Sequence, residues 1–265
     1  MEGKVVVITG AAGGIGRALC LRFGLSGAKV GMADINSERL GNLSEELEAQ
    51  EVDCLGLPLD VADEEACRRA MTAVLEHFGR IDVLVNNAGI THRSAFYDTE
   101  TEVYRRVMEV NYLGSVNCTK AALDELIRSR GLIVVTSSVA GFAPLLGRTG
   151  YAASKHALHG LFDTLRSELR RYGVAISIVC PGFTATDIGT HALDADGRPT
   201  KHPQSAVGKA ASPESVADEI YRAAVKRKRL TVLSGVGRLS RLLTRFCPAL
   251  YERIMERSLR AELER

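Results

Sequence analysis

The sequence predicts one α/β domain, built on a parallel sheet of about seven strands with helices on both faces. Short β-rich runs alternate about seven times with longer amphipathic stretches along the 265 residues. Runs such as residues 5–8 are apolar at every position, as a strand buried on both faces requires. Because each right-handed crossover returns the chain to the same edge, alternating strands and helices form a parallel sheet. The length and the apolar content suffice for one large core.

The predicted elements can be placed by their periodicity and by their flanking turn residues. Strand-like runs cover residues 4–9, 28–34, 52–60, 81–87, 131–138, 174–182 and 229–235. Predicted helices begin at Gly14, at Ser37, at Ala62 or Asp63, near residue 99, near residue 151 and at Ser212. The helix near residue 99 extends to about residue 130, and the helix near residue 151 extends to about residue 172.

Four glycines lie where the first strand meets the first helix, at Gly10, Gly13, Gly14 and Gly16. A helix N-terminus presents unpaired N–H groups and a partial positive charge, so it binds phosphate where no side chain intervenes. Gly10 allows a tight turn, Gly14 lets the backbone approach a pyrophosphate, and Gly16 lets the helix pack on the sheet. The alternative is a glycine-rich turn without a ligand. We expect a doubly wound Rossmann fold that binds its ligand at the carboxyl ends of the strands.

Asp34 ends the second strand, where a carboxylate accepts hydrogen bonds from the ribose hydroxyls of a dinucleotide. This charge repels a 2′-phosphate, and no Lys or Arg occurs from Gly10 to Gly16 to attract one. The expected cofactor is therefore NAD rather than NADP. The alternative role for Asp34 is to cap the next helix, which Asn36 or Ser37 can do equally well.

Tyr151 and Lys155 stand four residues apart in the stretch YAASK of a predicted helix. Their Cβ atoms are then roughly 5–6 Å apart on one helix face. Lowering the pKa of a tyrosine by about 2–3 units takes roughly 3–4 kcal/mol, which a nearby ammonium in a partly dry site supplies. The pair is a candidate acid/base, although the same spacing also occurs on surface helices.

Six motifs occur in a fixed order: TGAAGGIG (9–16), NNAG (86–89), Asn111 in VMEVNYLGS, TSS ending at Ser138, YAASK (151–155) and PGFTAT (181–186). Ser138 stands 13 residues before Tyr151. In these features the chain resembles the classical short-chain dehydrogenase/reductase family, over about residues 4–234.

The resemblance implies a catalytic group of Asn111, Ser138, Tyr151 and Lys155. Tyr151 would exchange a proton with the substrate oxygen, while hydride passes between substrate carbon and nicotinamide. Lys155 would lower the pKa of Tyr151 and hold the nicotinamide ribose. Ser138 would bind the substrate oxygen, with Ser137 as the competing candidate. Asn111 would hold a water that links Lys155 to solvent, or form a local kink in its helix, and the two roles are compatible.

The resemblance also places the cofactor along the carboxyl ends of the strands. Asn87 is assigned to the cofactor and Asn86 to the sheet, while Thr184 departs from the aliphatic residue common at its position in the family. The implied cofactor-binding residues are Gly10, Gly14, Ile15, Gly16, Asp34, Asp60, Val61, Asn87, Ala88, Gly89, Tyr151, Lys155, Pro181, Gly182, Thr184 and Thr186.

Two segments are expected to line the substrate pocket, residues 139–150 and the loop 183–211. The first is apolar and contains Phe142 and Leu145, which together with Ser138 and Tyr151 are the expected substrate-binding residues. Its apolar character favours a lipophilic alcohol or ketone of steroid, retinoid or fatty type. The loop has the composition of a lid. Two alternatives stay open: a 3-oxoacyl thioester reductase that uses NADPH, and a catalytically silent NAD-binding module.

Other features narrow the class of protein. His156 and His159 are expected to be packed or solvated rather than bound to metal, and the other histidines have no organised partners. The six cysteines form no C-x-x-C pair and are expected to be buried thiols. No run of roughly 20 apolar residues and no signal sequence is visible, so we expect a cytoplasmic protein. Nucleic acid is not an expected partner, because residues 1–221 carry more acidic than basic side chains.

Residues 235–265 form a basic amphipathic extension beyond the catalytic part, residues 1–234. From residue 222 to the end there are 12 Lys and Arg against 4 Asp and Glu. A stripe of Val236, Leu239, Leu242, Leu243 and Phe246 is flanked by arginines. The extension could contact an anionic membrane, the pocket mouth or another subunit. By family resemblance, the helices at 99–130 and 151–172 would form a homodimer or homotetramer.

Overall fold

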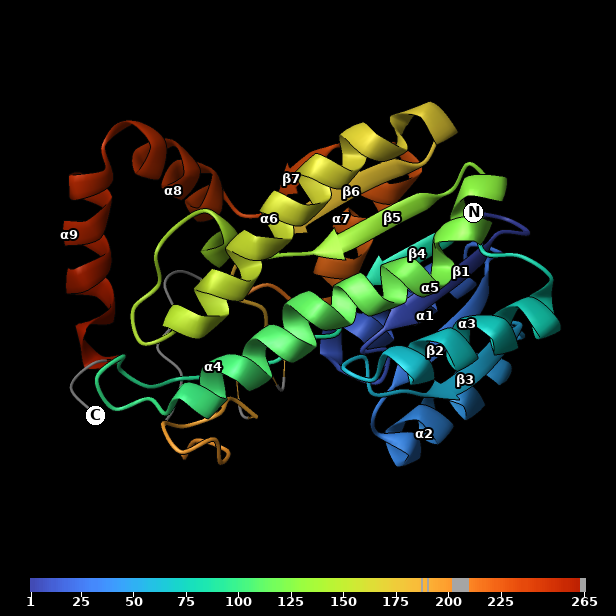
Figure 1. Ribbon diagram of the computed structural model, residues 1–265, viewed down its shortest axis with the longest axis horizontal. Helices are drawn as coiled ribbons and strands as arrows, with labels where there is room; N and C mark the ends of the chain where they lie inside the picture. Colours follow the sequence, from blue (N-terminus) through green and yellow to red (C-terminus); the bar gives the residue numbers. More distant parts are fainter. Residues whose placement is uncertain (187, 190, 202–209, 263–265) are drawn as a thin grey trace.

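A computed structural model describes residues 1–186, 188, 189, 191–201 and 210–262. The described part of the chain contains a seven-stranded sheet in the order β3-β2-β1-β4-β5-β6-β7, with every neighbouring pair parallel (Figure 1). The predicted fold is confirmed. The strands are β1 (Val5–Thr9), β2 (Lys29–Asp34), β3 (Cys54–Pro58), β4 (Val83–Asn86), β5 (Leu132–Thr136), β6 (Ala175–Cys180) and β7 (Leu230–Val232).

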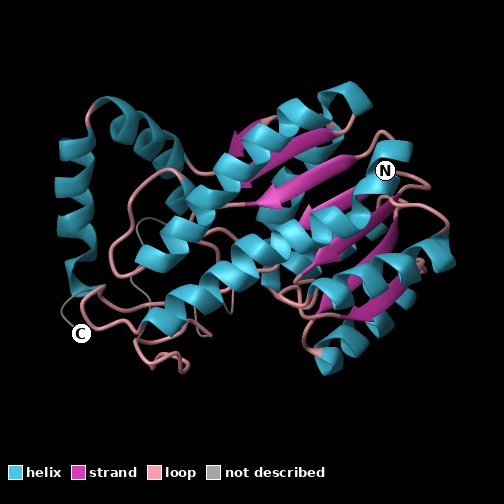
Figure 2. Ribbon diagram, in the orientation of Figure 1, coloured by secondary structure: helices cyan, strands magenta, loops and turns pink. Residues whose placement is uncertain are grey.

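Helices cover both faces of the sheet (Figure 2). Alternate residues of β1 face different cores: Val5 and Val7 pack with α3, α5 and α6, whereas Val6 and Ile8 pack with α1, α2 and α7. This explains why the strand is apolar at every position. The helices are α1 (Gly14–Gly24), α2 (Ser37–Glu48), α3 (Glu64–Phe78), α4 (Thr101–Met108), α5 (Gly114–Arg128), α6 (Thr149–Leu169), α7 (Pro213–Val225), α8 (Gly235–Phe246) and α9 (Pro248–Leu259).

Strand β1 lies at the point where the strand order reverses, because the chain adds β2 and β3 on one side of it and β4 to β7 on the other. Crossovers on the two sides lie on opposite faces, which leaves a crevice at the carboxyl ends of β1 and β4. The candidate site is expected in this crevice.

Side-chain caps fix the starts of the predicted helices. The Asn36 side chain accepts a hydrogen bond from Arg39 N at 2.9 Å and caps α2. Asp63 caps α3, and Ser212 caps α7. Because Asn36 is the cap of α2, the carboxylate of Asp34 is not needed for that task.

The long helix expected at 99–130 is interrupted. Between α4 and α5 lies one π-helical turn, Glu109–Leu113, and the buried Asn111 is at its centre. A π-turn places one extra residue in the helix, and such turns are frequent at functional sites. The helix is thus locally irregular at Asn111, and the predicted kink takes the form of this π-turn.

Two glycines of the first turn are required by the backbone. Gly10 has φ +63, and a Cβ on it would lie 2.8 Å from Ala88 Cα. A Cβ on Gly16 would lie 1.9 Å from the carbonyl oxygen of Gly10, so α1 can pack on the turn only through a glycine. Gly13 has ordinary extended φ of −86, and a Cβ there would come no closer than 3.6 Å to Gly10 O.

The cysteines correct one expectation. Cys247 is exposed and Cys54 is half-buried, whereas Cys20, Cys67, Cys118 and Cys180 are buried free thiols. Cys247 lies at the bend between α8 and α9, outside the strands and helices that bury the others.

Among the described residues, no helix combines the length and the apolar character that a bilayer crossing demands.

Gly16→Ala is expected to lower the stability of the ligand-free protein by about 1–3 kcal/mol, because the new methyl group overlaps the Gly10 carbonyl. Gly13→Ala is the matched control and should change the free energy of unfolding by less than about 0.5 kcal/mol. Urea unfolding followed by circular dichroism measures both. Equal stabilities for the two variants would contradict the packing assigned to Gly16.

Candidate active site

The first turns of α6 carry Tyr151 and Lys155 toward the carboxyl end of β5. Lys155 is 4% exposed, and its Nζ donates a hydrogen bond to the carbonyl oxygen of Thr136 at 2.9 Å. The ammonium lies 5.6 Å from the centroid of the Tyr151 ring. The predicted spacing therefore brings both side chains to one place, at the carboxyl end of β5.

Burial dominates the ionisation of this pair. It lowers the pKa of Lys155 to about 8, against a small opposing effect of Cys180. Burial also raises the pKa of Tyr151, while a hydrogen bond from Ser138 and the positive charge of Arg148 lower it. The net direction for Tyr151 is upward. This direction is opposite to the lowering of the Tyr151 pKa expected from Lys155, because burial dominates in the protein without dinucleotide.

Ser138 follows β5 and faces Tyr151. Its hydroxyl oxygen accepts the backbone N–H of Ala140 at 3.1 Å, while its O–H is directed to the phenol of Tyr151 and lowers the pKa of that group. The competing candidate, Ser137, points elsewhere, since its hydroxyl is 3.0 Å from Nε2 of His159. Of the two serines, Ser138 is the one placed to share a substrate oxygen with Tyr151.

Asn111 joins the π-turn to the loop after β4 and to α6. Its Oδ1 accepts the N–H of Ile90 at 2.8 Å, and its Nδ2 donates to Ile90 O at 3.0 Å and to Ser154 Oγ at 2.8 Å. Gly89 lies between Asn111 and Lys155, because a Cβ on it would be 3.1 Å from Asn111 Oδ1 and 3.5 Å from Lys155 Nζ. The water relay assigned to Asn111 stays a prediction.

The end of β4 is fastened to the glycine-rich turn. Asn87 Nδ2 donates to Thr9 O at 3.1 Å and to Gly10 O at 3.3 Å. Thr9 Oγ1 accepts the N–H groups of Asn87 and Ala88, each at 3.0 Å. Asn86 donates instead to Thr119 within the core, as expected of a structural residue. Asn87 thus holds the turn in shape, besides the cofactor contact predicted for it.

The N-terminus of α1 is suited to an anion. Gly13 is its N-cap residue, and no side chain caps the helix there. The space at Gly14 is taken by Thr186, whose Cγ2 would be 2.6 Å from a Cβ on Gly14. Ile15 packs against the core and Gly16 against the turn. The residues present fit a dinucleotide pyrophosphate, and the close approach expected at Gly14 stays a prediction.

Asp34 lies half-buried beside this helix. Its carboxylate accepts the N–H of Ala12 at 2.9 Å and the N–H of Asn36 at 2.9 Å. The nearest arginine in sequence to the glycine-rich turn, Arg17, is engaged in a forked ion pair with Glu46. The negative charge at the end of β2 is therefore not neutralised by Arg17.

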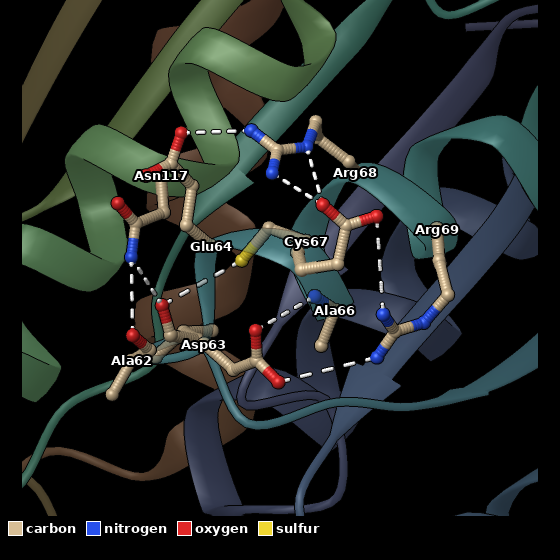
Figure 3. Close-up of polar contacts among 10 residues, drawn as sticks. Ala62, Asp63, Glu64, Ala66, Cys67, Arg68, Arg69 and Asn117 are labelled. Carbon is tan, nitrogen blue, oxygen red and sulfur yellow. Dashed lines mark hydrogen bonds and ion pairs between the residues drawn. The ribbon is translucent and has the colours of Figure 1, made fainter.

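The turn between β3 and α3 carries Asp60 and Val61. Figure 3 shows how Asn117 of α5 reaches this turn and donates to the carbonyl oxygens of Val61, at 3.0 Å, and Ala62, at 3.4 Å. The carboxylate of Asp60 accepts the N–H of Ala62 at 2.9 Å and is exposed at the rim of the site. This turn is thus held against α5, and the adenine contact expected of Asp60 stays a prediction.

The segment after β6 packs against the segment that carries Ser138. Pro181 O accepts the N–H of Val139 at 3.1 Å, which ties this segment to Ser138. Thr184 Oγ1 donates to Gly182 O at 3.3 Å, and Thr184 pairs with Ala211. Residues 187, 190 and 202–209 of the expected substrate loop lie outside the described residues.

The side chains expected to line the substrate pocket have different surroundings. Phe142 lies edge-on to His159, with ring centroids 6.3 Å apart, and packs against the core. Leu145 is half-buried in the loop before α6. The C-terminal helices lie against this loop, since Tyr251 of α9 donates its hydroxyl to Pro144 O at 3.0 Å. The apolar segment 139–147 is thus the part of the site that borders the extension.

His92 is a positioning residue that the sequence analysis missed. It is fully buried, and its Nε2 accepts the N–H of Gly150 at 2.9 Å, next to Tyr151. Burial, with a contribution from Arg148, lowers the pKa of His92 to about 4, so the ring is neutral and can accept. The expectation that this histidine has no organised partner is wrong, and no spacing in the sequence reveals a bond across 58 residues.

The pair His156 and His159 has two separate environments. His156 is exposed and donates from Nδ1 to Ala152 O at 2.9 Å, whereas His159 is half-buried beside Ser137 and Cys180. In the part of the chain that the structure describes, no cluster of three or more side chains has the composition of a metal site.

Comparison with known proteins gives concordant matches. The short chain dehydrogenase family profile matches residues 4–196. The chain is 38% identical to "Dehydrogenase/reductase SDR family member 7B" of Bos taurus, over 99% of this chain and 83% of the relative. A short chain dehydrogenase/reductase of Burkholderia phymatum, solved in complex with NAD, is 28% identical with a TM-score of 0.85, over 94% and 95% of the two chains. An alcohol dehydrogenase of Thermococcus sibiricus, complexed with 5-hydroxy-NADP, is 30% identical with a TM-score of 0.74, over 87% and 94%.

The His92 bond predicts a pH dependence of stability. Because the pKa of His92 is about 4 in the folded protein and about 6.5 unfolded, the unfolded chain binds the extra proton between these values. Stability from His92 is therefore present above pH 6.5 and is lost as the pH falls toward 4, by up to about 3 kcal/mol. His92→Gln, which keeps an acceptor for Gly150 N–H, should fall less steeply in urea unfolding over this range. Parallel curves for the two proteins would refute the assignment.

Proposed function

The chain belongs to the short-chain dehydrogenase/reductase family, and from this premise we propose that it interconverts a secondary alcohol and a ketone with NAD(H). The observation that carries the proposal is the convergence of Ser138, Tyr151 and Lys155 at the carboxyl end of β5. A hydroxyl donor, a phenol and a buried amine meet there beside the open N-terminus of α1. This set of groups can bind one oxygen atom and exchange one proton with it.

Each group has a task that its surroundings favour. Ser138, fixed by Ala140 N–H, is placed to donate a hydrogen bond to the substrate oxygen. Tyr151 would take the hydroxyl proton in oxidation and return it in reduction. Lys155, with its pKa lowered to about 8, can release a proton near neutral pH and so restore the protonation state of Tyr151. The bound nicotinamide supplies the hydride acceptor or donor.

Asp34 supports NAD as the preferred dinucleotide. Its carboxylate is half-buried at the end of β2 and touches Ala12 N–H, so it flanks the turn where the adenosine ribose would lie. A 2′-phosphate would meet this negative charge, while the guanidinium of Arg17 is occupied by Glu46. Gly13, Asn87, Ala88 and Asp60 would hold the rest of the dinucleotide.

A lipophilic substrate is supported by the segment that borders the catalytic group. Residues 139–147 carry Phe142 and Leu145, and the extension adds Tyr251 beside them. Apolar surface at this border favours a steroid-, retinoid- or fatty-type skeleton over a sugar. A panel of such alcohols and ketones, followed by nicotinamide absorbance with NAD and NADP in parallel, tests the proposal. Turnover of sugars alone would overturn the substrate class, and no turnover of any alcohol or ketone would overturn the reaction.

Tyr151→Phe is expected to lower kcat by at least about 100-fold, since it removes the proton-exchanging hydroxyl. NAD affinity, measured by calorimetry, should change by less than about threefold because the ring and Lys155 remain. Tyr104→Phe is a control that removes a phenol from the neighbouring helix α4, where its hydroxyl contacts Thr149 at 2.9 Å. An active Tyr151→Phe enzyme would refute the acid/base role.

Asp34→Asn separates charge from structure at the cofactor site. The amide oxygen can still accept from Ala12 N–H and hold the turn, while the bond from Asn36 N–H and the charge that repels a 2′-phosphate are lost. The ratio of kcat/KM for NAD to that for NADP should fall by about tenfold or more. A wild-type enzyme that prefers NADP, or a variant with an unchanged ratio, would contradict the role of Asp34.

A further inference from the structure

Helix α8 is packed on the protein with the smaller side chains inward. Gly237 and Ser240 are buried and Thr244 is half-buried, one helical turn apart in succession. A Cβ on Gly237 would lie 2.7 Å from Val139 Cγ2 and 2.9 Å from Val232 Cγ1, so only a glycine allows this contact. The helix is thus seated closely against the segment that follows Ser138.

Most of the large apolar side chains of α8 face solvent instead. Of the five residues of the expected stripe, Val236 is 50%, Leu239 57%, Leu242 58% and Phe246 71% exposed, whereas Leu243 is half-buried. A helix that served only to cover the core would bury these residues and expose Gly237 and Ser240. The orientation is therefore the reverse of that expected from packing within one chain.

Helix α9 also exposes apolar side chains. Leu250 is 49% and Ile254 46% exposed, four residues apart, whereas Tyr251 and Leu259 turn inward. Figure 1 shows that α8 and α9 form one edge of the molecule, on the side toward which the strand arrows point. Val236, Leu239, Leu242, Phe246, Leu250 and Ile254 are called the outer apolar face below.

The charges beside the outer apolar face are basic. On α8 the exposed side chains next to the stripe are Arg238, Arg241 and Arg245, and the helix contains no acidic residue. On α9 the exposed Arg253 and Arg257 flank Leu250 and Ile254 at helical spacing, whereas the exposed Glu252 and Glu256 lie on another side of this helix. Arginines beside a face of Leu, Ile and Phe match an anionic lipid surface, where the apolar side chains enter the headgroup boundary.

A second copy of the chain matches this face less well. A two-fold pairing of α8 with α8 of a second copy would bring two sets of three arginines together. Neither copy of α8 carries an acidic residue to neutralise them. An anionic bilayer offers apolar depth and negative charge together. We propose that the outer apolar face of α8 and α9 docks this protein on anionic membranes. The docking is independent of the proposed reaction, and it would place the segment 139–147 beside the bilayer.

Co-sedimentation with vesicles tests the docking without any measurement of turnover. The full-length protein should pellet with phosphatidylcholine vesicles that contain about 30% phosphatidylserine, and at least about tenfold less with pure phosphatidylcholine. Raising the salt from about 0.1 M to about 1 M should weaken the binding, since it screens the arginines. Wild-type protein that stays in the supernatant with anionic vesicles would overturn the proposal.

Two variants change the apolar side chains and the arginines in turn, and a control adds the same net negative charge as the first variant elsewhere on the surface. Leu239→Glu with Leu242→Glu should lower vesicle binding by at least about tenfold, because both side chains leave the bilayer. Arg238→Gln with Arg245→Gln keeps the apolar face and should also lower binding to anionic vesicles, by about tenfold. Leu25→Glu with Val225→Glu is the matched control on two exposed apolar residues at the C-terminal ends of α1 and α7, and it should bind as the wild type does.

Two further results would overturn the membrane-docking proposal, and both require that the variants are folded. Thermal melting within a few degrees of the wild type shows that a variant is folded. Vesicle binding by folded Leu239→Glu/Leu242→Glu at the wild-type level would overturn the proposal. Sedimentation velocity gives the second test. If the wild type is a dimer that this variant dissociates, and the wild type does not bind vesicles, the proposal is overturned, because the outer apolar face then joins two copies of the chain.

Discussion

The burial of one lysine at the end of β5 constrains the whole candidate site. The Nζ of Lys155 is held by the Thr136 carbonyl, so α6 must begin at one fixed height above the strand. A buried amine costs free energy unless its partners are fixed, and its lowered pKa is the sign of that cost. Gly89 leaves room for it, and Asn111 in the π-turn fastens Gly89's neighbour Ile90 to α6. Tyr151 and Ser138 meet as a consequence.

Much of this arrangement follows from local sequence rules. Period-2 and apolar runs identify the strands, and capping residues such as Asn36, Asp63 and Ser212 mark helix starts to the residue or nearly so. A four-residue interval suffices to place Tyr151 and Lys155 on one helix face. The glycine-rich turn is equally predictable from the sequence, because the crowding at Gly10 and Gly16 is between backbone atoms.

The rest depends on contacts between residues far apart in the chain. His92 binds Gly150 across 58 positions, and Thr186 fills the space at Gly14, so neither role is visible in a motif. The stripe on α8 is evident in the sequence, but periodicity does not reveal which face turns toward the protein. The upward direction of the Tyr151 pKa is likewise a result of burial, which counting charges on the helix does not capture.

The central claim is that Tyr151 becomes the acid/base of the reaction once NAD is bound. An ultraviolet titration of phenolate absorbance, wild type minus Tyr151→Phe, measures its ionisation with and without NAD. Burial should keep the hydroxyl above the ordinary pKa of tyrosine, about 10, in the free protein. In the complex it should fall below that value, toward the working pH of the enzyme. A Tyr151 that titrates at or above about 10 with NAD bound would contradict the claim.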